Sequence, residues 1–500
     1  MKNIPAFILT SLLSLGLVLT AASEGVETPT TNRIEKAAPK TAAKVINTRP
    51  VANAGPDVTI NSDRYHLDAS QSYDPNGLAN CDLLWTKIAG PPRATISHPT
   101  AAITPIIDLN MGVYTLRLTI TTHDGATSSD EVVITVPAQQ VKDKIDEYIT
   151  KQMEKSDVKG MSIAIIEGGK IVKVKGYGFT DAERTTPVTP RTLFQAASIS
   201  KVVTAMGALR LVENNRLALD EDVNKKLTSW KVPETEYTQE EKVTLRRLLC
   251  HMAGTTVDGF WGYVQGEPVP SLLTVLDGKP PANSAPIRVN AIPGTKTSYS
   301  GGGYTIIQQM IIDVSGQPFE EYMRDSVLNK LGMVNSTFEQ PLPPSKWDLA
   351  ASGYTANLGS ADPKRRPVPG KWRTHPEMAA AGFWTTAGDL ALYVIDIQDT
   401  YAGRSSKVIT KDMVAKMLTP VPMRNRWKMG LGMPLGGIGG TEAKGSFRAS
   451  GTNVGSGFQG AFVGNVQTGQ GAVVLYNDIQ AEMFPELIIQ FIAQEYAWPK

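Results

Sequence analysis

Two side chains three residues apart, Ser198 and Lys201, have the types and spacing needed for nucleophilic catalysis. Residues three apart in a helix share one face, and the apolar run from Val202 to Val212 has helical periodicity. A serine in this setting can attack a carbonyl carbon while a partly buried lysine accepts its proton. The helix N-terminus adds backbone N–H groups for the developing oxyanion. The pattern therefore predicts Ser198 as nucleophile and Lys201 as its base.

Ser-x-x-Lys is a short motif that also arises by chance, and the chain has a second copy from Ser156 to Lys159 in a polar stretch. The copy at Lys201 differs in its surroundings. The residues that follow Lys201 on its own face are all apolar: Ala205, Ala208, Leu209 and Val212. A lysine on such a face is out of place on a solvated surface, which favours the chemical interpretation.

A third candidate, Tyr299, lies in a turn-rich loop, 293–303, ahead of a helix predicted over 304–314. A phenol at a helix start can relay a proton to a leaving group. Taken alone, Tyr299 is equally consistent with an aromatic ring that packs over a glycine turn. Its assignment depends on the motifs around it.

Composition excludes several other functions. The 500 residues, 41% of them hydrophobic, exceed one ordinary domain, and the net charge of +2 comes without a basic stripe that would bind nucleic acid. The two cysteines, Cys81 and Cys250, fall in segments assigned to different domains, so we expect no disulfide framework. The five histidines have no metal-ligand spacing. We therefore expect neither a metal nor a cofactor.

The first 23 residues resemble a secretory signal, with Lys2, an apolar run from Ile4 to Leu19 and small residues at 21–23. A membrane anchor is the alternative, but the apolar run is short for a span and no basic flank follows it. Residues 24–50 have the composition of a disordered linker. We expect a secreted or periplasmic protein with no stable membrane span after signal cleavage.

Residues 51–137 have the pattern of an all-β sandwich. Apolar and polar residues alternate from Tyr114 to Ile120, and several short apolar runs are separated by turn clusters. Stretches such as 51–57, 67–70 and 74–77 resemble a PKD-type immunoglobulin-like module. Modules of this type act as spacers or contact cell surfaces and glycans. We expect a spacer, because the segment has no catalytic constellation.

Residues 141–500 form the second predicted domain. Strands from both of its ends flank a long helical middle, which indicates one antiparallel sheet with an inserted helical lobe. The tight turn Gly168-Gly169 joins the first two strands. The predicted elements are a helix over 141–153, strands over 161–167, 170–175, 459–463 and 471–476, and a helix over 481–496.

The order of motifs in this domain is similar to that of the serine β-lactamase and DD-peptidase superfamily, closest to its class C-like branch of family VIII carboxylesterases and D-peptidases. The resemblance implies a β-lactamase/transpeptidase-like α/β fold, with Ser198 as acylated nucleophile, Lys201 as base partner and Tyr299 as second proton carrier. It implies a structural role for His251. The motifs are 176–178, 198–201, 217–220, 248–254, 293–301, 331–333 and 386–390.

The chain departs from the superfamily's pattern at two positions. Gly301 stands where the lactamases usually carry an asparagine, and Ala449 stands at the cation of the third motif, Ala449-Ser450-Gly451. Ser450 and Gly451 can still line the site, and the resemblance implies that the Thr452 N–H is the second oxyanion donor. Arg448 is expected to face the opposite side of the strand. The missing cation favours neutral substrates over β-lactams.

Three functions remain open. The first is an exported serine hydrolase that forms an acyl-enzyme with ester or amide substrates. The second is a D-amino-acid peptidase or penicillin-binding protein that acts on cell-wall peptides, which requires another cation, with Arg448 and Arg424 as candidates. The third is a non-catalytic scaffold that retains the fold. We also expect residues 257–289 and 423–443 to shape the cleft.

Overall fold

The computed structural model describes residues 49–499, apart from positions 61, 63, 76, 93, 110, 182, 184 and 442 and the segments 357–364, 423–427, 439–440 and 480–483. The expected signal segment and the linker up to residue 48 lie outside the described residues, as does Arg424. None of the helices in the described ranges is long and apolar enough to cross a membrane.

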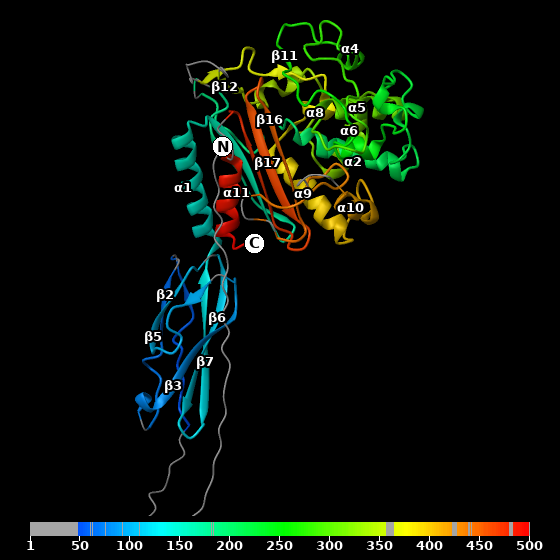
Figure 1. Ribbon diagram of the computed structural model, residues 1–500. Helices are drawn as coiled ribbons and strands as arrows, with labels where there is room; N and C mark the ends of the chain where they lie inside the picture. Colours follow the sequence, from blue (N-terminus) through cyan, green and yellow to red (C-terminus); the bar gives the residue numbers. More distant parts are fainter. Residues whose placement is uncertain are drawn as a thin grey trace, which may run out of the picture. The chain divides into compact units, whose positions relative to one another are not determined.

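The N-terminal module consists of two small sheets that enclose their own core (Figure 1). One sheet has the order β1-β7-β6-β3 and the other the order β2-β5-β4. Tyr114, Leu116, Leu118 and Ile120 are all fully buried, as their period of two predicts. The strands are β1 (Val58–Thr59), β2 (Tyr65–Asp68), β3 (Cys81–Ala89), β4 (Thr95–Ile96), β5 (Ile103–Ile107), β6 (Gly112–Thr122) and β7 (Thr127–Val136), with a 3-10 helix at Leu78–Asn80.

The second domain is built on a five-stranded antiparallel sheet of order β16-β17-β18-β8-β9. Strands from the two ends of the domain meet where β18 pairs with β8, with Val473 opposite Ala164. The predicted sheet of strands from both ends is thus confirmed, and each predicted strand extends by a few residues or matches. The strands are β8 (Gly160–Glu167), β9 (Lys170–Gly178), β16 (Ser446–Asn453), β17 (Phe458–Asn465) and β18 (Gly471–Tyr476).

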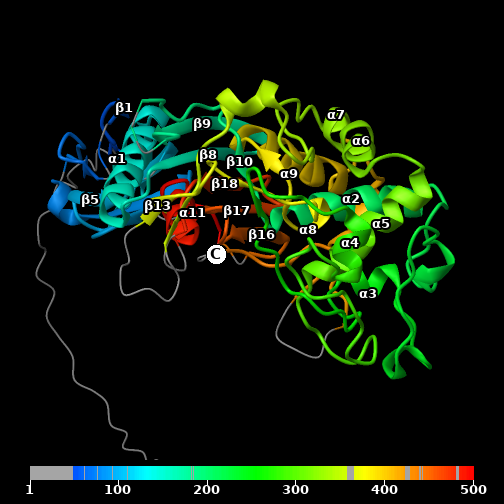
Figure 2. The same cartoon turned by 90° about the horizontal axis from the view of Figure 1, so that it is seen from above.

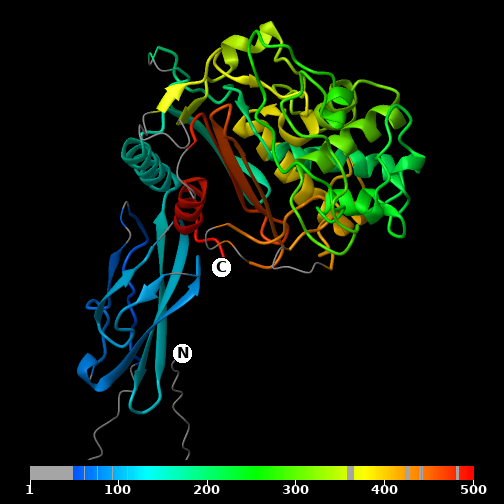
Figure 3. The same cartoon turned by 45° about the horizontal axis from the view of Figure 1, so that its top comes forward.

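Helices cover both faces of this sheet (Figures 1 and 3). On β8, Ile163 and Ile165 pack towards α1 (Ala138–Ser156) and α11 (Phe484–Glu495), while Ala164 and Ile166 belong to the core on the other face. β8 is therefore buried on both sides, which accounts for its apolar run from Ile163 to Ile166. The second face is covered by α9 (Ala387–Tyr401).

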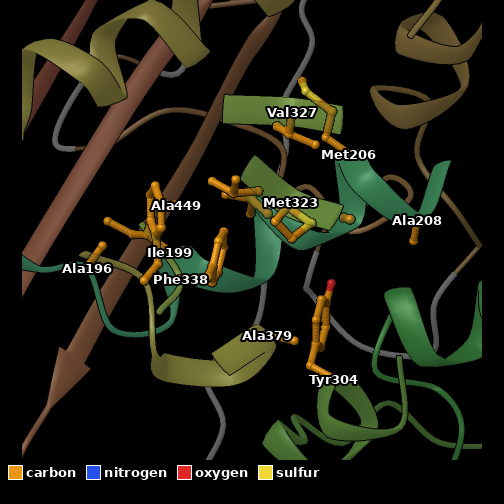
Figure 4. Close-up of a cluster of buried hydrophobic side chains, with 14 of the residues drawn as sticks. Ala196, Ile199, Met206, Ala208, Tyr304, Met323, Val327, Phe338, Ala379 and Ala449 are labelled. Carbon is orange, nitrogen blue, oxygen red and sulfur yellow. The ribbon is translucent and has the colours of Figure 1, made fainter. Parts of the chain in front are cut away.

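The helical lobe lies beyond α9 and beside the edge strand β16 (Figure 2). Its central helix is α2 (Ile199–Glu213), which is buried on nearly all sides among apolar side chains (Figure 4). The other elements of this region are α3 (Leu245–Leu249), α4 (Leu272–Asp277), α5 (Gly301–Ser315), α6 (Phe319–Met323), a π-helix (Arg324–Leu328), α7 (Asn329–Leu331), α8 (Met378–Ala381) and α10 (Lys411–Met417), with 3-10 helices at Val223–Lys225, Glu236–Thr238 and Pro344–Leu349.

Three short two-stranded ladders connect the lobe to the sheet. One of them, β10 with β15, leads directly into α2 and so fixes where that helix begins. The pairs are β10 (Phe194–Gln195) with β15 (Trp384–Thr385), β11 (Tyr263–Val264) with β14 (Arg373–Thr374), and β12 (Tyr354–Ala356) with β13 (Arg365–Pro367).

The carboxylate of Asp389 ties the β10–β15 ladder to α9. Its Oδ2 accepts hydrogen bonds from the Asn335 N–H at 2.9 Å and from the Ser336 N–H at 3.0 Å and hydroxyl at 2.8 Å. The Ser336 hydroxyl also contacts the Thr385 hydroxyl on β15 at 2.8 Å. Asp389 itself follows the cap residue Thr386, whose hydroxyl accepts from the Asp389 N–H at 3.0 Å. A single buried carboxylate therefore accepts the hydrogen bonds of both backbone N–H groups in the turn at 335–336.

Replacing Asp389 with Ala should lower the free energy of unfolding by about 3 kcal/mol, because it leaves the backbone donors of the turn at 335–336 unpaired. Urea unfolding followed by circular dichroism measures this. The exposed Asp412→Ala, in the first turn of α10, serves as the control and should change stability by less than about 1 kcal/mol. Equal losses in the two variants would contradict this role of Asp389.

Candidate active site

Ser198 caps the N-terminus of α2, directly after a sharp turn. Ala196 donates its N–H to the Phe383 carbonyl at 2.8 Å, and Ala197 has a φ of 49°, in the left-handed region. A non-glycine residue there is uncommon and persists only where surrounding contacts hold it. The strand β10, this turn and α2 together place the Ser198 side chain at the start of the helix.

Lys201 is one turn further along α2 and is only 5% exposed. Its Nζ donates to Ser198 Oγ at 3.1 Å and to the Ala380 carbonyl on α8 at 2.7 Å. The same amine lies 5.0 Å from the centroid of the Tyr299 ring and 5.8 Å from that of Tyr304. Lys201 is therefore held in place by a hydroxyl, a carbonyl and two aromatic rings.

Tyr299 completes a group of three around one oxygen atom. Its hydroxyl donates to Ser198 Oγ at 2.7 Å. The helix that follows, α5, starts at Gly301 with Ser300 as its cap, three residues earlier than the sequence predicts. Three residues that are widely spaced in the chain are thus brought to hydrogen-bonding distance, so the structure places all three predicted residues in one site.

His251 packs against the Tyr299 ring and binds the backbone next to it. Its Nδ1 accepts from the Ser300 N–H at 3.2 Å, and its ring lies 4.4 Å from the Tyr299 ring, centroid to centroid. Burial, with the nearby charge of Lys201, lowers the pKa of His251 to about 3, so the ring is neutral at physiological pH. The sequence predicts a structural role for this residue, but the contact with Tyr299 is a finding of the structure.

The third motif lies on the edge strand β16 and passes very close to the nucleophile. A Cβ built on Gly451 would be 2.6 Å from the Ser198 N atom and 2.5 Å from the Ala196 carbonyl oxygen. Only glycine allows this approach. Ala449 is buried in the apolar cluster that contains Ala196 and Ile199 (Figure 4), so position 449 supplies no cation.

The backbone of β16 also presents donors away from the sheet. The Arg448 N–H donates to the Pro434 carbonyl at 3.0 Å, and the Ser446 carbonyl accepts from the Gly436 N–H at 2.8 Å. The backbone N–H and C=O groups of the even-numbered residues of β16 therefore point away from β17. By this alternation the N–H groups of Ser450 and Thr452 also face outward. The Thr452 hydroxyl accepts from Gln459 Nε2 at 3.0 Å.

A cavity of about 480 Å³ opens at Ser198. Lys428, Met429, Gly432 and residues 434–437 line one part of it, which agrees with the expectation that 423–443 shapes the cleft, as far as that segment is described. No residue of 257–289 is in the lining of this cavity, so the expectation for that segment is not met here. Arg448 also lines the cavity, and its Nη1 donates to the Gly437 carbonyl. Arg448 faces the opposite side of β16 from the buried Ala449, as predicted, and it is one of the two cations that the sequence offers for the cleft. The cavity extends around the sheet edge.

The start of α5 at Gly301 is tightly packed. A Cβ there would lie 3.0 Å from both the Asp258 carbonyl oxygen and the Phe260 ring, and the Gly301 N–H donates to that same carbonyl at 3.1 Å. One built on Gly302 would lie 2.5 Å from the Thr256 oxygen. The segment 256–260 therefore packs against the start of α5, where an asparagine would not fit without a shift.

Sequence reasoning did not find two parts of this site, the Ala380 carbonyl and Lys428. A backbone acceptor leaves no signal in residue type, and Lys428 stands in a stretch without periodicity. Within the described residues, no cluster of three or more His, Cys, Asp or Glu side chains is arranged to hold a metal ion.

Comparisons with known proteins agree with this geometry. The family described as Beta-lactamase matches residues 145–495, and a PKD domain family matches residues 54–136. Both ranges lie inside the expected domain limits, 51–137 and 141–500. Two solved structures have the same fold with a TM-score of 0.55 over 71% of this chain. One is an octameric penicillin-binding protein homologue from Pyrococcus abyssi, 25% identical over 77% of its length. The other is D-alanine carboxypeptidase AmpC from Burkholderia cenocepacia, 20% identical over 99% of its length.

Among curated relatives, protein flp from Staphylococcus aureus strain N315 is 28% identical over 243 residues, 46% of this chain and 44% of that protein. A beta-lactamase from Pseudomonas fluorescens is 26% identical over 260 residues, 51% of this chain and 64% of its own length. The match thus spans less than half of the first relative. Since the family's pattern extends over residues 145–495, the chain belongs to the beta-lactamase family of serine hydrolases, and it carries a PKD-like domain ahead of the hydrolase fold.

Proposed function

We propose that this protein is an exported serine hydrolase that forms an acyl-enzyme on Ser198 with ester or amide substrates. The observation that carries the proposal is the placement of Ser198 Oγ, 3.1 Å from Lys201 Nζ and 2.7 Å from Tyr299 Oη. A hydroxyl held between an amine and a phenol is arranged to lose its proton as it attacks a carbonyl carbon.

The proposed reaction has two stages. Ser198 Oγ bonds to the acyl carbon while Lys201 accepts the hydroxyl proton. Tyr299 gives its phenolic proton to the departing alcohol or amine as the bond between that group and the acyl carbon breaks, and the proton held by Lys201 replaces it on Tyr299. Water then adds to the acyl-enzyme, its proton returns to Ser198 Oγ, and the carboxylic acid leaves. The outward N–H of Thr452 and the N–H of Ser198 are the proposed oxyanion donors, with Ser450 and Gly451 lining the site.

Two alternatives follow from particular observations. A D-amino-acid peptidase or penicillin-binding protein is supported by Arg448, which lines the cavity and offers a cation for a peptide carboxylate. A non-catalytic scaffold is supported only by the missing cation at Ala449. The intact hydrogen bonds around Ser198 favour an enzyme.

Export and the role of the N-terminal module are also proposals. We propose that residues 1–23 direct export to the periplasm or the medium, and that the PKD-like module acts as a spacer or contacts a cell surface or glycan. The composition of the first 23 residues and the match to a PKD domain family support them. N-terminal sequencing after cell fractionation checks the export, and a full-length chain retained in the cytoplasm would contradict it.

Ser198→Ala should abolish covalent labelling by a fluorophosphonate and the burst of p-nitrophenol from a short-chain ester, because the attacking oxygen is gone. Intact-mass spectrometry with the fluorophosphonate, the ester and a penicillin measures this. Ester adducts without a penicilloyl adduct would indicate an esterase. A stable penicilloyl adduct would favour the penicillin-binding alternative, and no adduct in the parent would refute the acyl-enzyme.

Lys201→Met and Tyr299→Phe should each lower kcat by about 10² to 10⁴-fold, since both remove a proton carrier. Steady-state hydrolysis of the p-nitrophenyl ester is the assay. Unchanged kcat in either variant would exclude that residue from proton transfer.

Gly451→Ala should reduce the labelling rate of Ser198 by about 100-fold, because the added methyl would push β16, and with it the Thr452 N–H, away from the Ser198 N–H. The matched control is Gly259→Ala, since a Cβ built on Gly259 meets no atom within 4 Å. If both variants were labelled at the rate of the parent, the close packing of β16 would not matter for reactivity.

A further inference from the structure

One backbone segment, 256–261, runs from the start of α5 to the turn that follows the edge strand β16. At the first end, the Gly301 N–H donates to the Asp258 carbonyl at 3.1 Å. At the other end, a Cβ built on Gly455 would lie 2.5 Å from the Trp261 carbonyl oxygen. The segment therefore contacts both of the elements that flank the nucleophile, α5 and β16.

Val257 gives this segment a strained conformation. Its φ is 63°, in the left-handed region, where a β-branched residue is a true outlier. The Val257 carbonyl accepts from the Gly302 N–H at 2.8 Å, and the neighbouring Thr256 carbonyl accepts from Ser300 Oγ at 2.9 Å. Such a conformation persists only where surrounding contacts impose it, and these outliers cluster at functional sites. The contacts with α5 thus set the direction in which the chain continues from Val257.

The ring of Phe260 occupies the space that a side chain at position 301 would need. A Cβ built on Gly301 would lie 3.0 Å from Phe260 Cε2 and 3.4 Å from Cδ2. The ring is half-buried and packs against the apolar cluster around α2. Position 301 is where the lactamases usually carry an asparagine. In this chain an apolar ring therefore takes the place of a polar amide, next to the loop that carries Tyr299.

Trp261 adds a second aromatic ring at the turn between β16 and β17. Its side chain is 55% exposed. A Cβ built on Gly455 would lie 3.2 Å from Trp261 Cε3, so the indole lies against that turn. With Phe260 at the start of α5 and Trp261 at the turn, the segment offers apolar surface at both of its ends, and aromatic side chains are typical of the walls of ligand sites.

The aromatic segment and the cavity lie at different ends of β16. The cavity is lined by residues 448–450 of this strand and by no residue of 256–261. Gly451, the next residue, is where the strand meets Ser198, and the turn beyond the end of the strand contacts Trp261. Along β16, the nucleophile therefore stands between the cavity and the aromatic segment.

The proposed reaction gives each part of the substrate its own direction. Tyr299 protonates the departing group and lines the cavity, so the leaving group lies on the cavity side. The carbonyl oxygen takes the proposed oxyanion donors, the N–H groups of Ser198 and Thr452. The acyl substituent is the part that remains, and it extends from Ser198 towards Phe260 and Trp261.

We propose that Phe260 and Trp261 form an apolar subsite for the acyl group. The preferred substrates are then esters or amides of apolar carboxylic acids, with an alkyl chain of medium length rather than a polar amide beside the carbonyl. This inference rests on the proposed function and assigns its substrate class. Each methylene group that is buried against the two rings stabilises the bound acyl group, so kcat/KM should rise with chain length. Water then releases the group from Ser198 as the free acid.

The test compares p-nitrophenyl acetate, butyrate and hexanoate, which share one leaving group and differ only in acyl length. Each kcat/KM is divided by the rate of hydrolysis of the same ester in buffer, and the hexanoate-to-acetate ratio of these values gives the acyl selectivity. We expect a selectivity of about 30-fold in the parent, below the value for four fully buried methylene groups because Trp261 is half exposed. Trp261→Ala should lower it about three- to tenfold and Phe260→Ala about tenfold. Phe260→Leu should restore part of it, because leucine keeps an apolar contact.

The matched control is Tyr401→Ala, which removes a partly exposed ring at the end of α9 and should leave the selectivity as in the parent. Labelling of Ser198 by a fluorophosphonate with a short alkyl chain reports an intact fold and nucleophile in every variant, and Trp261→Ala decides the case if Phe260→Ala is not labelled. A parent selectivity near one, or labelled Phe260 and Trp261 variants that match the control, would overturn the acyl subsite and leave the hydrolase standing. No Ser198-dependent labelling or turnover in the parent would refute the proposed function, and the subsite with it.

Discussion

The amine of Lys201 is buried in an apolar region, and a buried amine needs acceptors inside the protein. The structure supplies them from separate parts of the chain: Ser198 from the same helix, the Ala380 carbonyl from α8, and the ring faces of Tyr299 and Tyr304 from the start of α5. Each element that contacts the amine is thereby fixed relative to Ser198. The geometry of the site is to that extent a consequence of satisfying one buried polar group.

Close backbone packing is the second constraint. The edge strand β16 meets the turn before α2 at Gly451, and α5 begins against the segment 256–260 at Gly301 and Gly302. At both places a side chain would collide with backbone atoms, which cannot move aside as the end of a flexible side chain can. Glycine at these positions therefore determines how closely β16 and the loop that carries Tyr299 can approach Ser198.

Local patterns in the sequence predicted much of the fold, such as the period of two in 114–120 and the helix after Ser198, because burial repeats along one element. The order of motifs was sufficient to group Ser198 with its two partners. Contacts between distant segments had no such signal, so the Ala380 carbonyl was found only in the structure. Alternation correctly predicted that Arg448 faces the opposite side of β16 from Ala449, but β16 is an edge strand and both residues line the cavity. Alternation fixes the face of a sheet on which a side chain lies, not what lies beyond the last strand.

The cations near the cavity, Arg448 and Lys428, are exposed, whereas position 449 is buried, and this difference affects the desolvation energy. A lysine at position 449 would place a charge in the apolar cluster that contains Ala196 and Ile199, at the cost of its desolvation. Exposed cations such as Arg448 and Lys428 keep most of their hydration and so avoid that cost. The consequence is weaker attraction, because solvent and salt screen exposed charges. The buried Lys201 amine, by contrast, keeps its hydrogen bonds to Ser198 and the Ala380 carbonyl inside the protein.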